Sequence, residues 1–329
     1  MSAILGHDAP IAALAGAVAS GRFHHAWLLA GPRGVGKASV ADAAALRFLA
    51  DAAGPPVDLP GIAVPPDHRI AYLIEAGSHP DFARLARLAR EKTGDLARAI
   101  SVDQVRSLQR LFATAPTFSP LRVVVIDAAD DLERPAANAL LKMLEEPPPG
   151  TLFLLVCHAP GRLLPTIRSR CRLLRFGRLG DEVMRDVLEK ELPEASAGEI
   201  AALVRAGAGA PGQALRFAGL DIAGLDEVMT QLVREGDRGG AVRGMVARAL
   251  SARAAQPRYE AFLERAPARI AAEARTAEAP RLAPILELWE KARALAASAV
   301  PLSLDPQATV YELAGYLAAL APSGGAAKA

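Results

Sequence analysis

The sequence predicts an α/β fold, in which a doubly wound parallel sheet occupies the first half of the chain and purely helical domains follow. Three observations support this. A glycine-rich loop at residues 31–38 lies between a short apolar segment and a helical one, in the order strand, loop, helix. The run 122–127 is apolar and rich in valine, as in strands that are buried on both faces. After residue 181 strand patterns disappear and helical periodicity continues.

The loop consists of Gly31, Pro32, Arg33, Gly34, Val35, Gly36 and Lys37. In loops of this type backbone N–H groups surround the phosphates of a nucleotide, the lysine reaches the β- and γ-phosphates, and a following serine or threonine binds Mg²⁺. We therefore predict a phosphate site at 31–37 in which Ala38 cannot bind metal. Ser39 does not replace the hydroxyl, because it points about 100° away on a helix. The alternative is a glycine-rich turn that only reverses the chain, and the sequence leaves open whether nucleotide occupies the loop.

Caps, breakers and apolar runs define the other elements of this half. Asp8 caps a helix over 9–20, and Ser101 with Gln104 forms a capping box for a helix that ends near Ala113. Segment 53–67 is too rich in glycine and proline to be regular. The remaining predictions are strands at 25–30, 72–74, 122–127, 151–157 and 173–176, turns at 77–82 and 163–167, and helices at 38–49 and 135–146.

Asp127 ends the apolar run 122–127. In P-loop NTPases an acid at this position steadies Mg²⁺, so Asp127 is a predicted member of the nucleotide site. The next residue is Ala128, which offers no base to orient a water molecule. The alternative role for Asp127 is to cap the turn that follows the strand.

The second half of the chain is predicted to be helical, at 181–190, 196–207 and 212–218 and in a larger set over 226–320. Gly239-Gly240, Pro257, Pro280 and Pro301 interrupt this larger set. We therefore divide the chain into an α/β domain (1–177), a small helical domain (178–222) and a C-terminal helical domain (223–322), with a disordered tail at 323–329.

Composition narrows the class of protein. With 51% hydrophobic and 22% charged residues, the chain is globular rather than disordered. No apolar run approaches the roughly 18 residues of a membrane span, and the first residues do not resemble a signal peptide, so we expect a cytoplasmic protein. A net charge of +2 gives no general affinity for nucleic acid. Cys157 and Cys171 are not spaced as metal ligands, and no structural zinc is expected.

Three further motifs are more specific. They are residues 77–82 (Gly-Ser-His-Pro-Asp-Phe), 138–148 (Asn-Ala-Leu-Leu-Lys-Met-Leu-Glu-Glu-Pro-Pro) and 168–171 (Arg-Ser-Arg-Cys). With the phosphate loop, they resemble the bacterial clamp-loader branch of the AAA+ family, and 77–82 is similar to the delta-prime subunits of DNA polymerase III. The resemblance covers residues 1–220 by motif and the remainder by architecture only. It implies a P-loop AAA+ domain, a three-helix lid and a helical collar through which five subunits form an open ring.

The chain departs from the ATP-hydrolysing, or motor, subunits of that family. They carry threonine where this chain has Ala38, glutamate where it has Ala128, and a lid arginine where it has Gly212. The resemblance would also place a zinc module after the P-loop helix, and segment 53–67 has no cysteine to form it. The resemblance therefore implies a non-motor subunit. It also makes Arg170 an arginine finger, a guanidinium that one subunit supplies to ATP bound by its neighbour. The alternative for Arg170 is a surface arginine paired with a carboxylate.

The function implied is that of a non-motor, delta-prime-like subunit without ATPase activity of its own. It would support ATP-driven loading of the sliding clamp on primed DNA, with motor tau/gamma and delta subunits as partners and no membrane contact. ATP is a possible ligand of this chain itself. Two alternatives remain, namely a motor subunit of the same assembly and an unrelated P-loop kinase or regulatory NTPase. Both would turn over ATP alone, so ATP titration with a turnover assay separates them.

Overall fold

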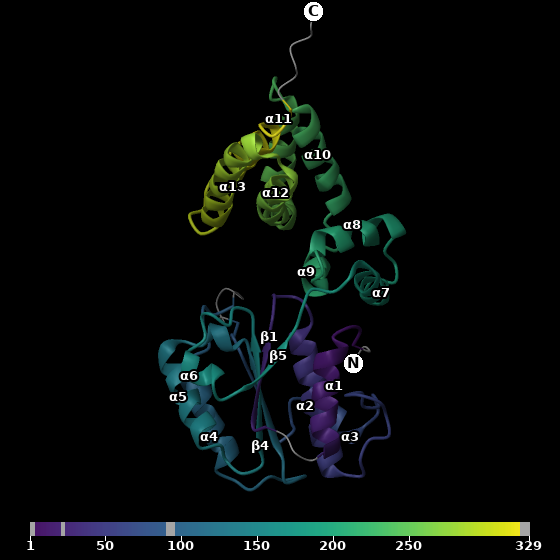
Figure 1. Ribbon diagram of the computed structural model, residues 1–329, viewed down its shortest axis with the longest axis vertical. Helices are drawn as coiled ribbons and strands as arrows, with labels where there is room; N and C mark the ends of the chain where they lie inside the picture. Colours follow the sequence, from purple (N-terminus) through teal and green to yellow (C-terminus); the bar gives the residue numbers. More distant parts are fainter. Residues whose placement is uncertain (1–3, 21–23, 90–95, 323–329) are drawn as a thin grey trace, which may run out of the picture. The chain divides into compact units, whose positions relative to one another are not determined.

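The computed structural model describes residues 4–20, 24–89 and 96–322 (Figure 1). The chain forms two compact units. The first contains Met1–Val187 and Ala208–Gln213, and the second contains Leu188–Gly207 and Ala214–Ala329. The predicted disordered tail, 323–329, lies outside the described residues. The three-domain division at residues 177 and 222 stays a prediction.

The first unit is built on a five-stranded parallel sheet with the strand order β2-β3-β4-β1-β5. The strands are β1 (Ala26–Ala30), β2 (Phe82–Ala86), β3 (Arg122–Asp127), β4 (Thr151–Cys157) and β5 (Arg172–Arg175). Every residue of β1 and β4 is buried, as are residues 122–126 of β3. Apolar and β-branched runs suit strands that are covered on both faces. The predicted α/β fold with a parallel sheet is therefore confirmed.

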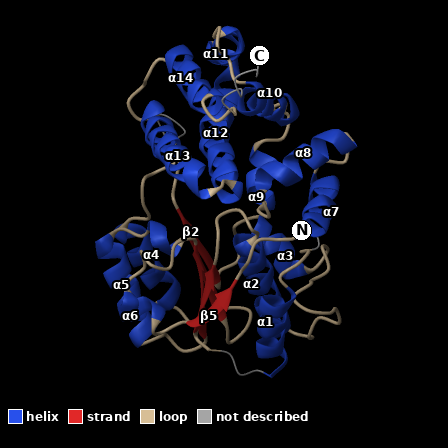
Figure 2. Ribbon diagram, turned by 45° about the horizontal axis from the view of Figure 1, so that its top comes forward, coloured by secondary structure: helices blue, strands red, loops and turns tan. Residues whose placement is uncertain are grey.

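Helices cover both faces of this sheet (Figures 1 and 2). On one side lie α1 (Asp8–Ser20), α2 (Lys37–Ala53) and α3 (Arg69–Glu75), and on the other lie α4 (Val102–Phe112), α5 (Arg134–Glu145) and α6 (Pro165–Arg168). Successive side chains of a strand point to opposite faces. Val123 and Val125 accordingly belong to the core beneath α2, whereas Val124 and Ile126 belong to the core beneath α4 and α5.

The capping box at the start of α4 is confirmed. The Gln104 backbone N–H donates to Ser101 Oγ (3.3 Å), and the Ser101 N–H donates to Gln104 Oε1 (3.1 Å). Two N–H groups that the first helical turn leaves without a partner are thereby satisfied.

The strand predicted at 72–74 is wrong, because these residues lie in α3. His68 caps this helix by accepting the Ile70 N–H at 3.2 Å. Ile70 is buried, Tyr72 is exposed, and Leu73 with Ile74 packs against the α2 core, which is a helical rather than an alternating pattern. The edge strand β2 follows instead, at Phe82–Ala86.

The irregular segment 54–67 follows α2 and is organised by one buried arginine. Arg47 Nε donates to Asp51 Oδ2 at 2.8 Å. Its Nη atoms donate to three backbone carbonyls of the segment, those of Val57 (2.8 Å), Leu59 (2.7 Å) and Ala63 (3.0 Å). Such a segment has no strand or helix N–H groups to pair with its carbonyls, so the guanidinium supplies the donors.

Replacing Arg47 with alanine should lower the free energy of unfolding by about 3 kcal/mol, because it leaves Asp51 Oδ2 and three carbonyls without their donor. Urea unfolding followed by circular dichroism measures this. Arg106→Ala is the control: Arg106 lies 3.7 Å from Asp103 on the exposed face of α4, and its loss should cost less than about 0.5 kcal/mol. Equal costs for the two variants would contradict the organising role of Arg47.

The chain beyond the sheet is helical, as predicted. The helices are α7 (Asp181–Glu191), α8 (Ala197–Gly207), α9 (Pro211–Arg216), α10 (Ile222–Glu235), α11 (Ala241–Ser251), α12 (Gln256–Thr276), α13 (Ala279–Ala299) and α14 (Pro306–Ala318). Pro257 and Pro280 stand in the first turns of α12 and α13, where the missing N–H costs nothing.

Helices α12, α13 and α14 pack against one another in the second unit. Their core includes Phe262, Ile270 and Leu313, which are fully buried. Helix α13 also carries Leu282 and Leu286 on its exposed side. Among the described residues, no helix combines the length and the apolar character needed to cross a membrane.

Candidate functional site

The phosphate loop connects β1 to α2, and its glycines are required by its shape. Gly34 has φ +79° and Gly36 has φ +101°, values that side chains rarely tolerate. A Cβ on Gly31 would lie 2.1 Å from the Phe176 carbonyl oxygen. The strand, loop and helix predicted from the sequence are present in that order. This backbone is compatible with the predicted phosphate loop, and phosphate binding at residues 31–37 stays a prediction.

Lys37 lies inside the cradle and is only 2% exposed. Its Nζ donates to the carbonyls of Gly31 (2.7 Å) and Pro32 (2.5 Å). Burial lowers the pKa of this ammonium to about 8, although Asp130 and Asp127 act in the opposite direction. An anion bound in the loop would oppose this desolvation and favour the charged lysine. The loop and Lys37 thus fit a phosphate group.

Residues 208–213, which belong to the first unit, close against the loop. The Gly212 N–H donates to the Gly34 carbonyl at 2.8 Å. A Cβ on Gly212 would lie 3.2 Å from Gly34 Cα, so there is no room for a larger residue unless the backbone moves. A residue before α1 contacts the loop as well, because His7 Nε2 lies 2.7 Å from the Val35 carbonyl oxygen. Gly212, the position at which the resemblance places a lid arginine in motor subunits, therefore contacts the loop through its backbone.

Asp127 lies at the end of β3, as predicted, but its carboxylate is engaged. Arg84 of β2 donates from Nη2 to Asp127 Oδ2 at 2.8 Å, and Arg84 Nε lies 3.3 Å from Asp42 Oδ1 of α2. Sequence reasoning missed Arg84 because the strand that carries it was not predicted. Ala38 offers no oxygen, and Asp127 is held by a guanidinium. These residues therefore do not fit the Mg²⁺ ion that P-loop folds usually hold beside the nucleotide.

Asp130 and His158 also lie near Lys37 and were missed by sequence reasoning. Burial would raise the pKa of Asp130, but the backbone N–H groups of His158 (2.8 Å) and Ala159 (3.1 Å) hold it below its usual value. Burial, and next the charge of Lys37, lowers the pKa of His158. A charged Asp130 thus helps to balance Lys37, and no signal in the sequence singles out either residue.

Arg170 follows α6, and its side chain is 36% exposed. Its Nη2 lies 2.9 Å from Glu145 Oε1 at the end of α5, and its Nη1 donates to the Thr166 carbonyl at 3.0 Å. Arg168 instead donates to the Pro160 carbonyl at 3.2 Å. Burial raises the pKa of the Cys171 thiol to about 12, which does not suit a nucleophile. The structure thus gives Arg170 a carboxylate partner within the chain while leaving part of its side chain accessible.

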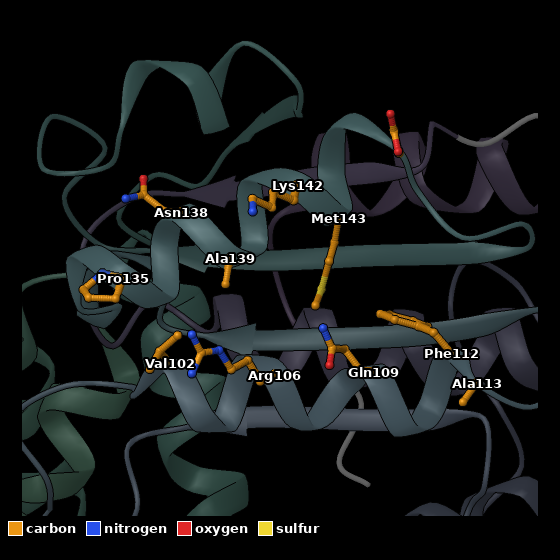
Figure 3. A pocket seen from close by; sticks show the side chains of 11 residues that line it. Val102, Arg106, Gln109, Phe112, Ala113, Pro135, Asn138, Ala139, Lys142 and Met143 are labelled. Atoms are coloured by element: carbon orange, nitrogen blue, oxygen red, sulfur yellow. The ribbon is translucent and has the colours of Figure 1, made fainter.

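A groove of about 670 Å³ lies between α4 and α5 (Figure 3). The side chains of Gln109, Phe112 and Met143 point into it. It lies on the α4 and α5 side of the sheet, whereas the phosphate loop leads into α2 on the other side. The groove is therefore separate from the phosphate site. In the described part of the chain, no three His, Cys, Asp or Glu side chains cluster so as to hold a metal ion.

Comparison with known proteins identifies the family of the chain. The family model described as "DNA polymerase III, delta subunit" matches residues 6–180, a little over half of the chain. A DNA polymerase III subunit delta' from Pseudomonas aeruginosa is 35% identical over 212 residues, which are 64% of this chain and 59% of that protein. The Escherichia coli delta' subunit is 38% identical over 147 residues, 45% of this chain and 42% of that protein. Subunit gamma/tau of Mycobacterium tuberculosis is 33% identical over 212 residues, 63% of this chain and 34% of that protein.

A solved structure also resembles the fold. A DNA polymerase III gamma subunit-related protein from Thermotoga maritima superposes with a TM-score of 0.50 at 15% identity, covering 94% of this chain and 99% of that one. At such identity the likeness concerns the fold alone. The match to the Pseudomonas delta' subunit spans about three fifths of that relative's length. The family model, which matches more than half of the chain, establishes its membership: this chain belongs to the DNA polymerase III delta-subunit family.

Proposed function

We propose that this chain is a non-motor, delta-prime-type subunit of a DNA polymerase III clamp loader, which loads the sliding clamp on primed DNA by using ATP bound to neighbouring subunits. One observation carries the proposal: the chain keeps a phosphate cradle without the groups that hydrolysis needs. Ala38 supplies no metal ligand, Ala128 supplies no base, and Asp127 is paired with Arg84. The relatives named delta' support the same assignment.

The alternative function is that of a motor subunit, and the similarity to gamma/tau subunits at 33% identity favours it. A motor subunit needs, at its own site, a water molecule that a base positions and a triphosphate that is bound to a metal ion. Here the lid position is Gly212, whose backbone N–H contacts the loop at 2.8 Å. Without a hydroxyl, a base or a lid arginine, this site is not suited to hydrolysis. The residues therefore favour the non-motor role.

In this proposal Arg170 acts on ATP that a neighbouring subunit binds. A planar guanidinium stabilises the charge that develops on the γ-phosphoryl group, and it does so as a two-pronged donor. In the isolated chain Glu145 holds the guanidinium at 2.9 Å. Because both side chains are partly exposed, this pair is weak, and a phosphate with higher charge can replace the carboxylate. Glu145 would then orient Arg170 before the subunits meet.

Assembly is assigned to the C-terminal helices, the predicted collar. Helix α13 exposes Leu282 and Leu286, which are one helical turn apart and 36% and 42% exposed. Exposed leucines on one helix face are typical of surfaces that a partner covers. We infer that this face of α13 contacts another clamp-loader subunit.

The double variant Leu282→Glu/Leu286→Glu should remain folded, because both side chains are exposed, yet lose assembly with motor and delta subunits, because burying two charges at an interface is costly. Size-exclusion chromatography of the mixed subunits measures this. Tyr72→Glu on α3, 58% exposed, is the matched control and should assemble normally. Normal assembly of the double variant would show that this face of α13 is not the interface.

A further inference from the structure

Arg84 of β2 contacts two carboxylates, those of Asp127 and Asp42. Strands β2 and β3 are parallel neighbours, with Arg84 level with Val125 and Ala86 level with Asp127. Side chains two residues apart on a strand share a face, and Val125 faces the α2 core. Arg84 and Asp127 therefore lie on the face of the sheet that carries α2 and the phosphate loop. Their contact of 2.8 Å joins the two strands at this edge.

Arg84 also lies close to a second carboxylate, that of Asp42. Asp42, one turn beyond the start of α2, places Oδ1 3.3 Å from Arg84 Nε. Burial raises the pKa of Asp42, and the charge of Arg84 opposes that rise. One guanidinium thus bridges two carboxylates, one from the strand that usually supplies the metal-binding acid and one from the loop helix. The Asp127 contact is a hydrogen bond and the Asp42 contact is a charge contact only, and charges that form a network contribute more than an isolated surface pair.

We propose that Arg84 replaces Mg²⁺ at this site, so that no divalent cation binds at Asp127 and any contact of nucleotide phosphate with the Lys37 loop is independent of Mg²⁺. A hard cation such as Mg²⁺ needs free carboxylate and hydroxyl oxygens in octahedral geometry. Ala38 has no side-chain oxygen, and one oxygen of the Asp127 carboxylate, Oδ2, is already engaged by Arg84 at 2.8 Å. This proposal concerns the chain's own phosphate loop and does not depend on the role of Arg170.

A simpler explanation is that the missing hydroxyl at Ala38 alone prevents Mg²⁺ binding, and the proposal differs from it. If only the hydroxyl were missing, Ala38→Thr would restore a response to Mg²⁺. If Arg84 holds Asp127, Ala38→Thr has no such effect until the guanidinium is also removed. Removing Arg84 alone would leave Asp42 without its cation, so Arg84→Gln is combined with Asp42→Asn, which removes one positive and one negative charge together.

The experiment is isothermal titration of the full-length chain with ATP, in Mg²⁺ and in EDTA. The wild-type chain and Ala38→Thr should show no Mg²⁺ preference, with affinities within about twofold or with no binding in either buffer. The triple variant Ala38→Thr/Arg84→Gln/Asp42→Asn should bind ATP at least about tenfold more tightly in Mg²⁺ than in EDTA. Adding Asp127→Asn to the triple variant should abolish that preference.

A tenfold Mg²⁺ preference in the wild-type chain or in Ala38→Thr would overturn the proposal, because both proteins retain Arg84. A folded triple variant that is indifferent to Mg²⁺ would also overturn it, and its thermal melting curve establishes that it is folded. These outcomes concern ATP binding at this chain's own phosphate loop. They are therefore distinguishable from a failure of the proposed clamp-loader role, which is read from the activity of assembled subunits.

Discussion

Arg170→Ala should leave the chain folded and assembled while the reconstituted complex loses ATP hydrolysis at one of its sites. The side chain is partly exposed, so its removal creates no core cavity. An arginine finger contributes on the order of 10³ to 10⁵ in rate at the site it serves. If the other ATP sites use arginines of other subunits, as the proposed function implies, the total should fall only in part. Steady-state ATP hydrolysis stimulated by clamp and primed DNA, at matched assembly, measures the loss.

Three variants control this result. Arg170→Lys should rescue poorly, because a point charge on a flexible stem does not reproduce the planar fork. Arg168→Ala, two residues away and bonded to the Pro160 carbonyl at 3.2 Å, should have a smaller effect. Glu145→Gln should leave most of the activity, because in the proposed function the carboxylate only orients Arg170 before assembly. Wild-type hydrolysis with Arg170→Ala would remove this arginine from the mechanism.

The isolated chain should show no ATP turnover above background. The absence of a positioned base at Ala128 alone costs about 10² to 10⁴ in rate, and the absence of a hydroxyl at Ala38 removes a metal ligand as well. A phosphate-release assay with the purified chain at saturating ATP measures this. Turnover near 1 s⁻¹, a usual value for an enzyme, would instead support the motor alternative.

Restoring the hydroxyl at position 38 and the base at position 128 together should not create ATP hydrolysis in the phosphate-release assay. Ala38→Thr combined with Ala128→Glu would return a ligand and a base, yet Arg84 would still hold Asp127 at 2.8 Å. Gly212 would still stand in the place of the lid arginine, with its N–H bonded to the Gly34 carbonyl. We therefore expect hydrolysis to require changes at several of these positions rather than at one residue.

Much of the fold follows from local sequence signals. The strand 122–127 is apolar and rich in valine along its length, and it forms the buried β3. The capping box of Ser101 and Gln104 marks the start of α4 and is formed with both hydrogen bonds. Signals of this kind succeed because propensity, patterning and tertiary burial agree at the same residues.

The errors fall where local signals conflict with tertiary context. Residues 72–74 are apolar and short, so they suit a strand as well as a helix, and only the burial of Ile70 and the exposure of Tyr72 distinguish the two. β2 was missed because it is an edge strand with the half-exposed Arg84 at its centre. The organisation of segment 54–67 by Arg47 depends on carbonyls 10 to 16 residues away in sequence, which no local pattern reveals.

For the candidate site, the sequence motif predicts some residues, and only the structure reveals others. The loop residues 31–37 could be predicted, because their glycines are required by backbone conformation. The engagement of Asp127 by Arg84 could not, because it joins residues 43 positions apart. The roles of Arg170 and of nucleotide in the Lys37 loop stay proposals that the experiments above decide.

The most direct test of the clamp-loader assignment is clamp loading itself. The motor, delta and clamp proteins of the same organism are mixed with ATP and primed circular DNA, with or without this chain, and DNA-bound clamp is measured after gel filtration. Efficient loading should require the chain, because the proposed ring is otherwise incomplete and one ATP site lacks its arginine. An equal rate of loading without the chain would contradict the clamp-loader assignment.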